Sequence, residues 1–363
     1  MQADIVDPLV VNESLNTEAR EIRRTIAMRD NPGDLEAYIR AWSEDDVMDG
    51  TPCRAFVVIL KTRGCTWALA GGCTMCGYAN ESAWSKVSEA QLVAQFTRAW
   101  KRYEGEPLLK IYTSGSFVDP KEVMPEAQKR ILEIAAVPGT VKKLAFESLP
   151  GFIQEGTFEP LNGLLPKLEV GIGVESSNLR VLRDSINKGH PFEAFPTAAA
   201  ICKEHGVSVK AYLMAKPPFL KESDALVNAA NTIAAAGPYA DVVSLNPTNV
   251  QGKTVVDALY RRGSFRAPWL WTLVEALRTG LPGAIEGGFK GILKSDVIAA
   301  GQSRGAHNCG QCDERVVGFL KKFKATQDAT WLERCMNDVQ CRCRKEWELV
   351  RALGPLIPAY SDL

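Results

Sequence analysis

The chain has 363 residues, of which 46% are hydrophobic and 24% charged, the composition of an ordinary folded globular protein. Lys plus Arg equal Asp plus Glu at 43 each, so no overall charge draws the chain to nucleic acid, and an RNA contact needs a local patch. The sequence has no apolar run of membrane-spanning length and no signal-peptide pattern at residues 1–4, which predicts a cytoplasmic protein without membrane contact. Ten cysteines in that reducing compartment indicate metals or clusters and not disulfides.

The first predicted elements are helices. We expect them over residues 18–28 and 35–43, with Asn31-Pro32-Gly33 as the break between them. Residues 1–50 are therefore predicted to form an N-terminal helical extension. A core domain over residues 51–300 and a cysteine-rich C-terminal module over residues 301–363 are expected to follow.

Strands and helices are predicted to alternate from about residue 54. The apolar, β-branched run at 55–60 indicates a strand buried on both faces. Further strands are expected at 108–112, 143–146, 168–174, 207–214 and 242–245, and helices at 88–103, 122–136, 192–204, 223–235 and 269–278. Another extended piece is expected at 287–293. Six strands alternating with helices predict an α/β fold, either an open doubly wound sheet or a curved, incomplete barrel.

The loop after the first of these strands holds three cysteines. Seven residues separate Cys65 from Cys73, and two separate Cys73 from Cys76. Three close thiolates with no fourth nearby suit a 4Fe–4S cluster in which one iron has no protein ligand, so that a small molecule can bind there. A zinc site completed by a distant ligand, or thiols that only pack, are the alternatives.

This loop resembles the radical S-adenosylmethionine (SAM) superfamily, and in particular its archaeosine-biosynthesis branch, which acts on transfer RNA. The resemblance is carried by residues 62–67 and 71–78, and it extends through 210–219, 246–251 and 266–271 over most of the chain. It implies a six-stranded partial (β/α) TIM barrel with a 4Fe–4S cluster and SAM as cofactors. In such barrels the chemistry lies at the C-terminal ends of the strands, where the cysteine loop is predicted to be.

The resemblance also implies SAM contacts after the second strand. Ser114, Gly115 and Ser116 take the place of a glycine-rich segment that contacts the SAM amino group. That segment usually ends in Glu, and Ser116 stands there in this chain. Tyr78 is a candidate aromatic face for the adenine ring.

Further SAM contacts are implied after the third and fourth strands, where similar enzymes place groups that bind ribose hydroxyls and the methionine carboxylate. Glu147, Glu175 and Lys188 are the candidates, with Glu175 and Lys188 predicted to fill these two roles. Each is also of a type common in solvated loops and caps. Asn246, Asn249 and Gln251 are expected to face the substrate, or to serve the turn that follows the sixth strand.

A second group of cysteines lies in the C-terminal module. Cys309, Cys312, Cys341 and Cys343 form two paired-thiol hooks that indicate a metal site, with zinc as the prediction and an auxiliary iron–sulfur cluster as the alternative. Basic residues near these hooks, such as Lys324 and Arg344, suit either RNA contact or a solvated helix face.

The resemblance implies a function in tRNA modification. A reductant would supply one electron to the cluster, SAM would be cleaved to a 5′-deoxyadenosyl radical, and hydrogen abstraction would lead to C–N cleavage. The implied substrate is a lysine adduct of 7-cyano-7-deazaguanine in tRNA, made by a lysine-transferring archaeosine synthase partner subunit. Alternatives are a radical SAM enzyme acting on another tRNA base or a peptide, and a non-catalytic iron–sulfur or zinc scaffold of an RNA-modifying complex.

Overall fold

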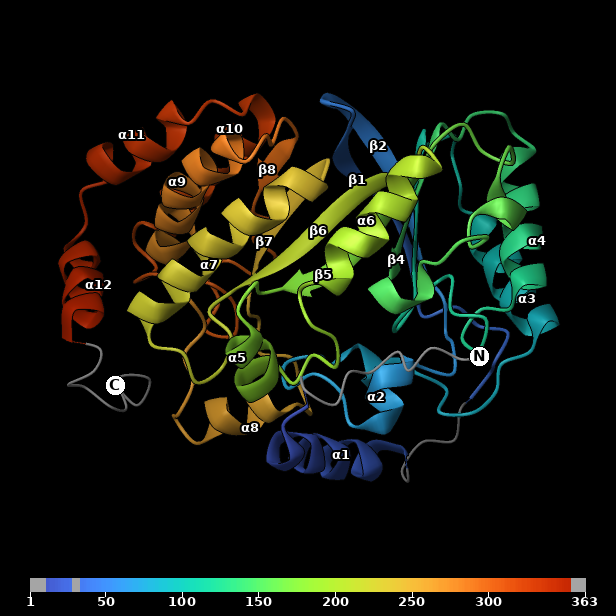
Figure 1. Cartoon of the computed structure of the whole chain (residues 1–363), viewed down its shortest axis with the longest axis horizontal. Coiled ribbons are helices and arrows are strands. Elements are labelled where there is room, and N and C mark those ends of the chain that lie inside the picture. The colour runs from blue at the N-terminus through green and yellow to red at the C-terminus, as the bar shows by residue number, and fades with distance from the viewer. Residues whose placement is uncertain (1–10, 28–32, 354–363) are drawn as a thin grey trace.

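A single curled sheet of eight strands forms the centre of the molecule, with the strands in chain order from β1 to β8 (Figure 1). The computed structural model describes residues 11–27 and 33–353. The strands are β1 (Arg40–Met48), β2 (Thr51–Ile59), β3 (Leu108–Tyr112), β4 (Lys143–Ser148), β5 (Leu168–Glu175), β6 (Ser208–Ala215), β7 (Val242–Pro247) and β8 (Ile292–Lys294). Strands β2 to β8 are parallel, and β1 is antiparallel to β2.

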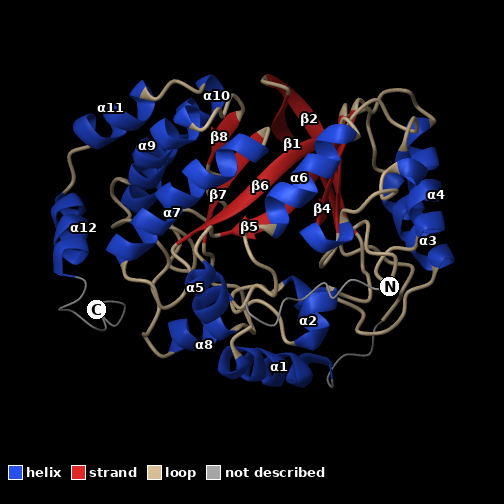
Figure 2. Ribbon diagram, in the orientation of Figure 1, coloured by secondary structure: helices blue, strands red, loops and turns tan. Residues whose placement is uncertain are grey.

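The helices lie mainly on the outer face of this sheet and beneath one end of it (Figure 2). Those of the N-terminal half are α1 (Glu13–Ala27), α2 (Thr66–Ala70), α3 (Glu89–Trp100), α4 (Pro125–Ala136), α5 (Leu179–Val181) and α6 (Ala194–Glu204). Those that follow are α7 (Glu222–Ala236), α8 (Val255–Arg261), α9 (Leu270–Glu286), α10 (Asp313–Thr326), α11 (Thr330–Asp338) and α12 (Arg342–Leu353).

The predicted six parallel strands are confirmed as β2 to β7. A doubly wound sheet reverses its strand order at a switch point, whereas this sheet keeps chain order and curls into an open half-barrel. The α/β partial barrel is therefore the correct alternative. The extended piece expected at 287–293 is found as β8, a short seventh parallel strand.

The predicted helix over residues 35–43 is wrong. The chain there leads into β1, which pairs with β2 through a hairpin whose turn is Asp49-Gly50. Both turn residues have positive φ, at 51° and 78°, which is the geometry of a two-residue hairpin with an Asp-Gly turn. The predicted helix over residues 18–28 corresponds to α1; its last residue lies outside the described part of the chain.

Strand β5 shows how the sequence separates the two faces of the sheet. Val170, Ile172 and Val174 are buried in the main core against the helices. The alternate positions, Glu169, Gly171, Gly173 and Glu175, lie on the opposite face because successive side chains of a strand point to opposite sides. This opposite face is the inner face of the barrel, here called the lumen. Strand β5 therefore contributes two glutamates and, between them, two glycines to the lumen.

The C-terminal helices pack on the barrel and share its core. Trp347 of α12 is fully buried, and its indole Nε1 donates a hydrogen bond of 2.8 Å to Thr272 Oγ1 on α9. The division at residues 51 and 301 stays a prediction about domain organisation. In residues 11–27 and 33–353, no helix combines the length and apolar character needed to cross a membrane.

Candidate cluster and cofactor site

The cysteine loop lies at the C-terminal end of the strands, between β2 and α3. Cys65 directly precedes α2, and the thiols of Cys65, Cys73 and Cys76 are half-buried. The charge of Cys76 contributes to raising the pKa of both Cys65 and Cys73, so the three thiols lie near one another. Three thiols from one short loop suit a 4Fe–4S cluster in which one iron has no protein ligand, whereas a closed structural zinc site takes four ligands.

The first helix holds the backbone of this loop. The buried guanidinium of Arg23 on α1 donates to the carbonyl oxygens of Gly71, Cys73 (3.0 Å) and Cys76 (3.3 Å). Arg20 donates to the carbonyl of Ala70 at 2.9 Å, and α1 and α2 lie side by side beneath the barrel (Figure 1). Sequence reasoning placed this helix outside the main domain and missed Arg23. The charge of an arginine on an otherwise amphipathic helix gives no signal that it is buried.

The loop is also held from the segment after β5. Asn187 donates from Nδ2 to the carbonyl of Gly72 at 3.0 Å and accepts an indole hydrogen bond from Trp67 on its own carbonyl at 2.7 Å. Thr74 donates to the carbonyl of Ser185 at 2.8 Å. Asn187 has a φ of 54°, a left-handed conformation that Asn tolerates better than most residues.

The electrostatics of the thiols fit a cationic cofactor. Burial raises the pKa of Cys65 to about 12, and the neighbouring Glu122 acts in the same direction. Burial also raises the pKa of Cys73 to about 11, although the charges of Lys188 and Arg23 oppose the rise. Thiols must lose their protons to bind metal, so these half-buried groups need a positive partner, and iron supplies one. The donor set and its surroundings therefore fit a 4Fe–4S cluster.

The segment Ser114-Gly115-Ser116 packs directly against the cysteine loop. A Cβ on Gly115 would lie 2.7 Å from Cys65 Cα, so only glycine fits this approach. Ser114 Oγ donates to the carbonyl of Tyr78 at 3.3 Å. Ser116 is fully buried and its Oγ accepts from the amide of Leu149 at 2.8 Å, so its side chain is directed into the protein.

Glu122 is a site residue that sequence reasoning missed. Its carboxylate accepts hydrogen bonds from the amides of Gly115 (3.1 Å) and Ser116 (2.7 Å), and from Thr62 Oγ1 (2.7 Å). Burial raises the pKa of Glu122 to about 7. A glutamate therefore does serve this turn, but from six residues beyond Ser116, and the sequence offers no spacing rule that identifies it.

Glu175 and Lys188 are brought together beside Cys73. Lys188 Nζ lies 2.9 Å from Glu175 Oε1, and their side chains are only 6% and 13% exposed. Burial disfavours the charged lysine, but Glu175 and the Cys73 thiolate outweigh it and raise the Lys188 pKa above its usual range. A bulge at Gly173 and a φ of 64° at Glu175 end β5 and turn this carboxylate toward the lysine.

The remaining predicted contacts have different surroundings. Tyr78 is 59% exposed, and its phenol forms a hydrogen bond with the Gln251 side chain. Gln251 accepts a hydrogen bond from the amide of Gly77 on its Oε1, which makes it an anchor of the cluster loop. Asn246 Oδ1 accepts from Ser244 Oγ at 3.0 Å, while the buried Oδ1 of Asn249 has no hydrogen-bond partner within the described chain. Glu147 lies in the lumen, near Lys210 and Tyr212.

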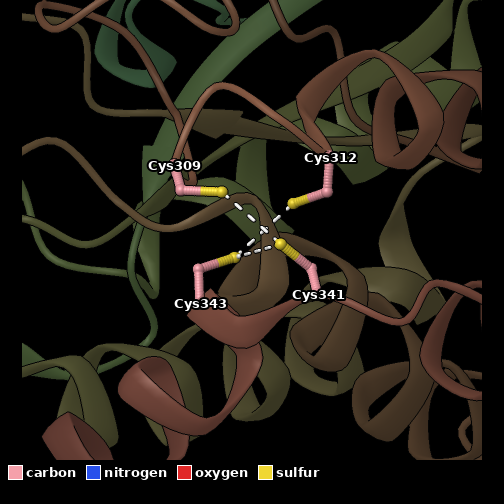
Figure 3. A group of neighbouring side chains, drawn as sticks. All are labelled: Cys309, Cys312, Cys341 and Cys343. Carbon is pink, nitrogen blue, oxygen red and sulfur yellow. Dashed lines mark hydrogen bonds between the residues drawn. The ribbon is translucent and has the colours of Figure 1, made fainter.

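The four C-terminal cysteines point toward a common centre (Figure 3). The Sγ–Sγ distances are 3.5 Å for Cys309–Cys341, 3.5 Å for Cys312–Cys343 and 3.4 Å for Cys341–Cys343, and all four sulfurs lie within 4.8 Å of one another. A tetrahedral ion with metal–sulfur bonds of about 2.3 Å needs this close approach. As the sequence predicts, these four cysteines form a group of their own that does not include the three cysteines of the loop after β2.

Basic side chains around this cysteine group are largely engaged within the protein. Lys324 pairs with Asp296 at 2.8 Å, and Arg344 pairs with Glu348 at 3.0 Å while lying over the Trp347 ring. These contacts favour the structural alternative to RNA contact for these two residues.

Comparisons with known proteins give a consistent assignment. The chain is 38% identical over 341 residues to the archaeosine synthase subunit beta of Methanosarcina acetivorans, covering 93% of this chain and 96% of that protein. It is 35% identical over 325 residues to the protein of that name from Thermococcus kodakarensis, covering 87% of this chain and 97% of that protein.

Matches to solved structures are more distant. Methylornithine synthase is similar with a TM-score of 0.46 and 11% identity, over 93% of this chain and 91% of that one. Elp3 from Methanocaldococcus infernus is similar with a TM-score of 0.45 and 17% identity, over 64% of this chain and 58% of that one. No family model matches the chain. The identity and coverage of the two archaeal relatives show that the chain belongs to the archaeosine synthase subunit beta family.

Proposed function

We propose that this protein is a radical SAM enzyme of tRNA modification. It cleaves a C–N bond in a lysine adduct of 7-cyano-7-deazaguanine in tRNA and leaves archaeosine, which makes it a lyase-type enzyme. The observation that carries the proposal is the set of three loop thiols at the C-terminal end of a curled parallel barrel, in a chain similar over 93% of its length to a protein named archaeosine synthase subunit beta.

In this proposal, Cys65, Cys73 and Cys76 hold a 4Fe–4S cluster. When bound, the cluster supplies an electron to SAM at the iron that has no protein ligand. Arg23 fixes the carbonyl groups of the loop, so that the three thiols keep their mutual spacing. The backbone of Gly115 and Ser116 is held against the loop by Glu122.

The polar groups at the ends of the strands bind and orient SAM in this proposal. Lys188 neutralises the methionine carboxylate and Glu175 accepts from the ribose hydroxyls, which requires their present ion pair to rearrange or to share its charges with the ligand. Tyr78 offers its exposed ring to the adenine. Glu175 and Lys188 are largely buried, so few water molecules reach them, which limits side reactions of an organic radical formed beside them.

We also propose that Cys309, Cys312, Cys341 and Cys343 bind one Zn²⁺ that stabilises the C-terminal helices. The short sulfur–sulfur distances support a single ion over a cluster. Asn308 Nδ2 and Trp271 Nε1 each lie 3.4 Å from a cysteine sulfur, at Cys312 and Cys343, and these N–H donors stabilise thiolate charge.

The proposed partners are tRNA, a lysine-transferring archaeosine synthase partner subunit and a reductant, acting in the cytoplasm. The word subunit in the relatives' names supports a partner chain. The experiment is an anaerobic reaction of cluster-loaded protein with SAM, reductant and lysine-adduct tRNA. We expect 5′-deoxyadenosine and archaeosine together. Formation of 5′-deoxyadenosine without archaeosine would refute the substrate, and formation of neither would refute the reaction class.

A further inference from the structure

The lower lumen is closed by paired charges. Lys110 pairs with Glu44 at 2.6 Å and with Asp46, both on β1, so the antiparallel strand places carboxylates against this lysine. Lys143 pairs with Asp49 at 2.7 Å and with Glu169 at 3.3 Å. These groups leave a cavity of about 40 Å³, which Lys210 and Tyr212 also line; it has room for a few water molecules or a polar group of that size, and not for a whole substrate. A ligand in the lumen must therefore enter from the cysteine end and stop above these pairs.

Lys210 differs from the other lysines that line this cavity. Lys294 and Lys324 both pair with Asp296, at 2.7 Å and 2.8 Å, but no carboxylate oxygen of the described chain lies within 4.0 Å of Lys210 Nζ. Its ammonium group lies 4.6 Å from the centroid of the Tyr212 ring. Lys210 is only partly buried, so its charge faces the lumen without an ion-pair partner.

Glu147 lies in the same row of the sheet as Lys210. The register pairs Glu147 of β4 with Gly171 of β5, and Gly171 with Lys210 of β6. Two strand spacings separate the two backbones by about 9.5 Å. The residue between them, Gly171, has no side chain, and the ring of Tyr212 covers it so closely that a Cβ there would lie 2.6 Å from the ring.

Burial raises the pKa of Glu147, and the charge of Lys210 opposes that rise, although no ion pair joins these two side chains in the described chain. A phosphate would be repelled by Glu147, and a simple cation would be repelled by Lys210. A zwitterion satisfies both charges, because its carboxylate meets Lys210 and its ammonium meets Glu147. The phenols of Tyr112 and Tyr212 line the cavity beside Lys210 and add neutral hydrogen-bonding groups.

The row also lies near the cluster loop. The charge of Glu147 acts on Tyr78, which follows Cys76 by two residues, and Glu175 and Lys188 act in turn on Glu147. A ligand bound by Glu147 and Lys210 thus extends toward the cofactor region. On the proposed function, the lysine part of the substrate ends in a free amino-acid group on the side away from the base.

We propose that Glu147 and Lys210 bind this amino-acid end of the substrate, with Lys210 on its carboxylate and Glu147 on its ammonium group. This inference rests on the proposed function and specifies how the substrate is held. In this inference Glu147 binds the substrate, and not SAM as the sequence resemblance implies. The reacting end of the lysine chain then points up toward the cysteine loop.

The test compares tRNA carrying three adducts, made with lysine, with 1,5-diaminopentane, which lacks the carboxylate, and with 6-aminohexanoate, which lacks the α-ammonium. Lys210→Met should lower kcat/KM for the lysine adduct by roughly 10- to 100-fold, the size expected for a charged hydrogen bond, yet change the diaminopentane adduct less than about 2-fold. Glu147→Gln should likewise lower kcat/KM for the lysine adduct, and should change kcat/KM for the 6-aminohexanoate adduct less than about 2-fold. Binding of each adduct tRNA without SAM should weaken in the same pattern.

Lys210→Arg, which keeps the charge, should retain most activity, and exposed Lys290→Met serves as the control. Iron content of each variant checks that it folds. Equal losses on all three adducts, or no loss on the lysine adduct, would overturn the inference and leave the proposed function standing. If the parent protein cleaves SAM but converts no lysine adduct, the proposed function and this inference fail together.

Discussion

Arg23 Nη2 donates a hydrogen bond of 3.0 Å to the carbonyl oxygen of Cys73. The contact joins the first helix to the loop that carries the thiols, across 50 residues of sequence. Because the guanidinium also reaches Gly71 and Cys76, one buried side chain satisfies three carbonyl groups of a loop that has little regular structure of its own.

Arg23→Ala should therefore loosen the loop. Each buried carbonyl left without a partner costs about 1–3 kcal/mol, which is enough to lower retention of the cluster. We expect clearly less iron per chain after reconstitution and a lower Tm. Arg24→Ala, which removes an exposed arginine from the same helix, is the control. Equal iron in both variants would show that Arg23 does not support the loop.

Gly115→Ala should have a similar effect from the opposite side. The added methyl group would lie 2.7 Å from Cys65 Cα and from Glu122 Oε2, a contact that forces the turn away from the cluster loop. We expect reduced iron loading, measured by absorbance and metal analysis. Gly318→Ala on α10 meets no atom within 4 Å and should leave loading unchanged. The account of this turn is wrong if the two variants load iron alike.

Sequence patterns predict the parts of this site that depend on local interactions, and they miss the parts that depend on contacts between distant residues. The apolar run at 55–60 and the close thiols are visible in the chain, and β2 and its loop were expected there. The dipeptide Asp49-Gly50 is a local signal for a hairpin turn. The predicted helix over residues 35–43 is incompatible with that hairpin, so the strand β1 was not expected. The roles of Arg23, Glu122 and Gln251 depend on contacts across 6 to 174 residues, which no periodicity encodes.

His190 predicts a pH dependence of stability. Burial, reinforced by Lys188, lowers the pKa of His190 to about 3, whereas the unfolded chain binds the proton near pH 6.5. The unfolded state therefore binds more protons than the folded state between these values, and stability falls as the pH falls through this window. From pH 6.5 to 5 the loss due to His190 is about 2 kcal/mol.

His190→Gln should remove that part of the loss. Denaturant unfolding of parent and variant at pH 7 and at pH 5 measures it, as a difference in the change of the free energy of unfolding. The variant is expected to lose about 2 kcal/mol less than the parent on acidification. If both proteins lose the same amount, His190 is not held neutral by the fold.

The C-terminal thiols should bind zinc independently of the cluster. Cys312→Ser should remove zinc, lower the Tm and leave the iron content unchanged, because the site stabilises helices packed on α9. Cys335→Ser is the matched control, since this cysteine is buried in the same module but lies outside the group of four thiols. Loss of iron together with zinc in Cys312→Ser would instead support an auxiliary cluster.

The central claim is that Cys65, Cys73 and Cys76 hold the cluster that acts on SAM. Its most direct test is anaerobic analysis of iron, sulfide and zinc per chain in the parent protein and in Cys73→Ala. The account predicts about four irons, about four sulfides and about one zinc in the parent, and a variant that keeps its zinc but loses its iron. Unchanged iron and sulfide in Cys73→Ala would contradict the account.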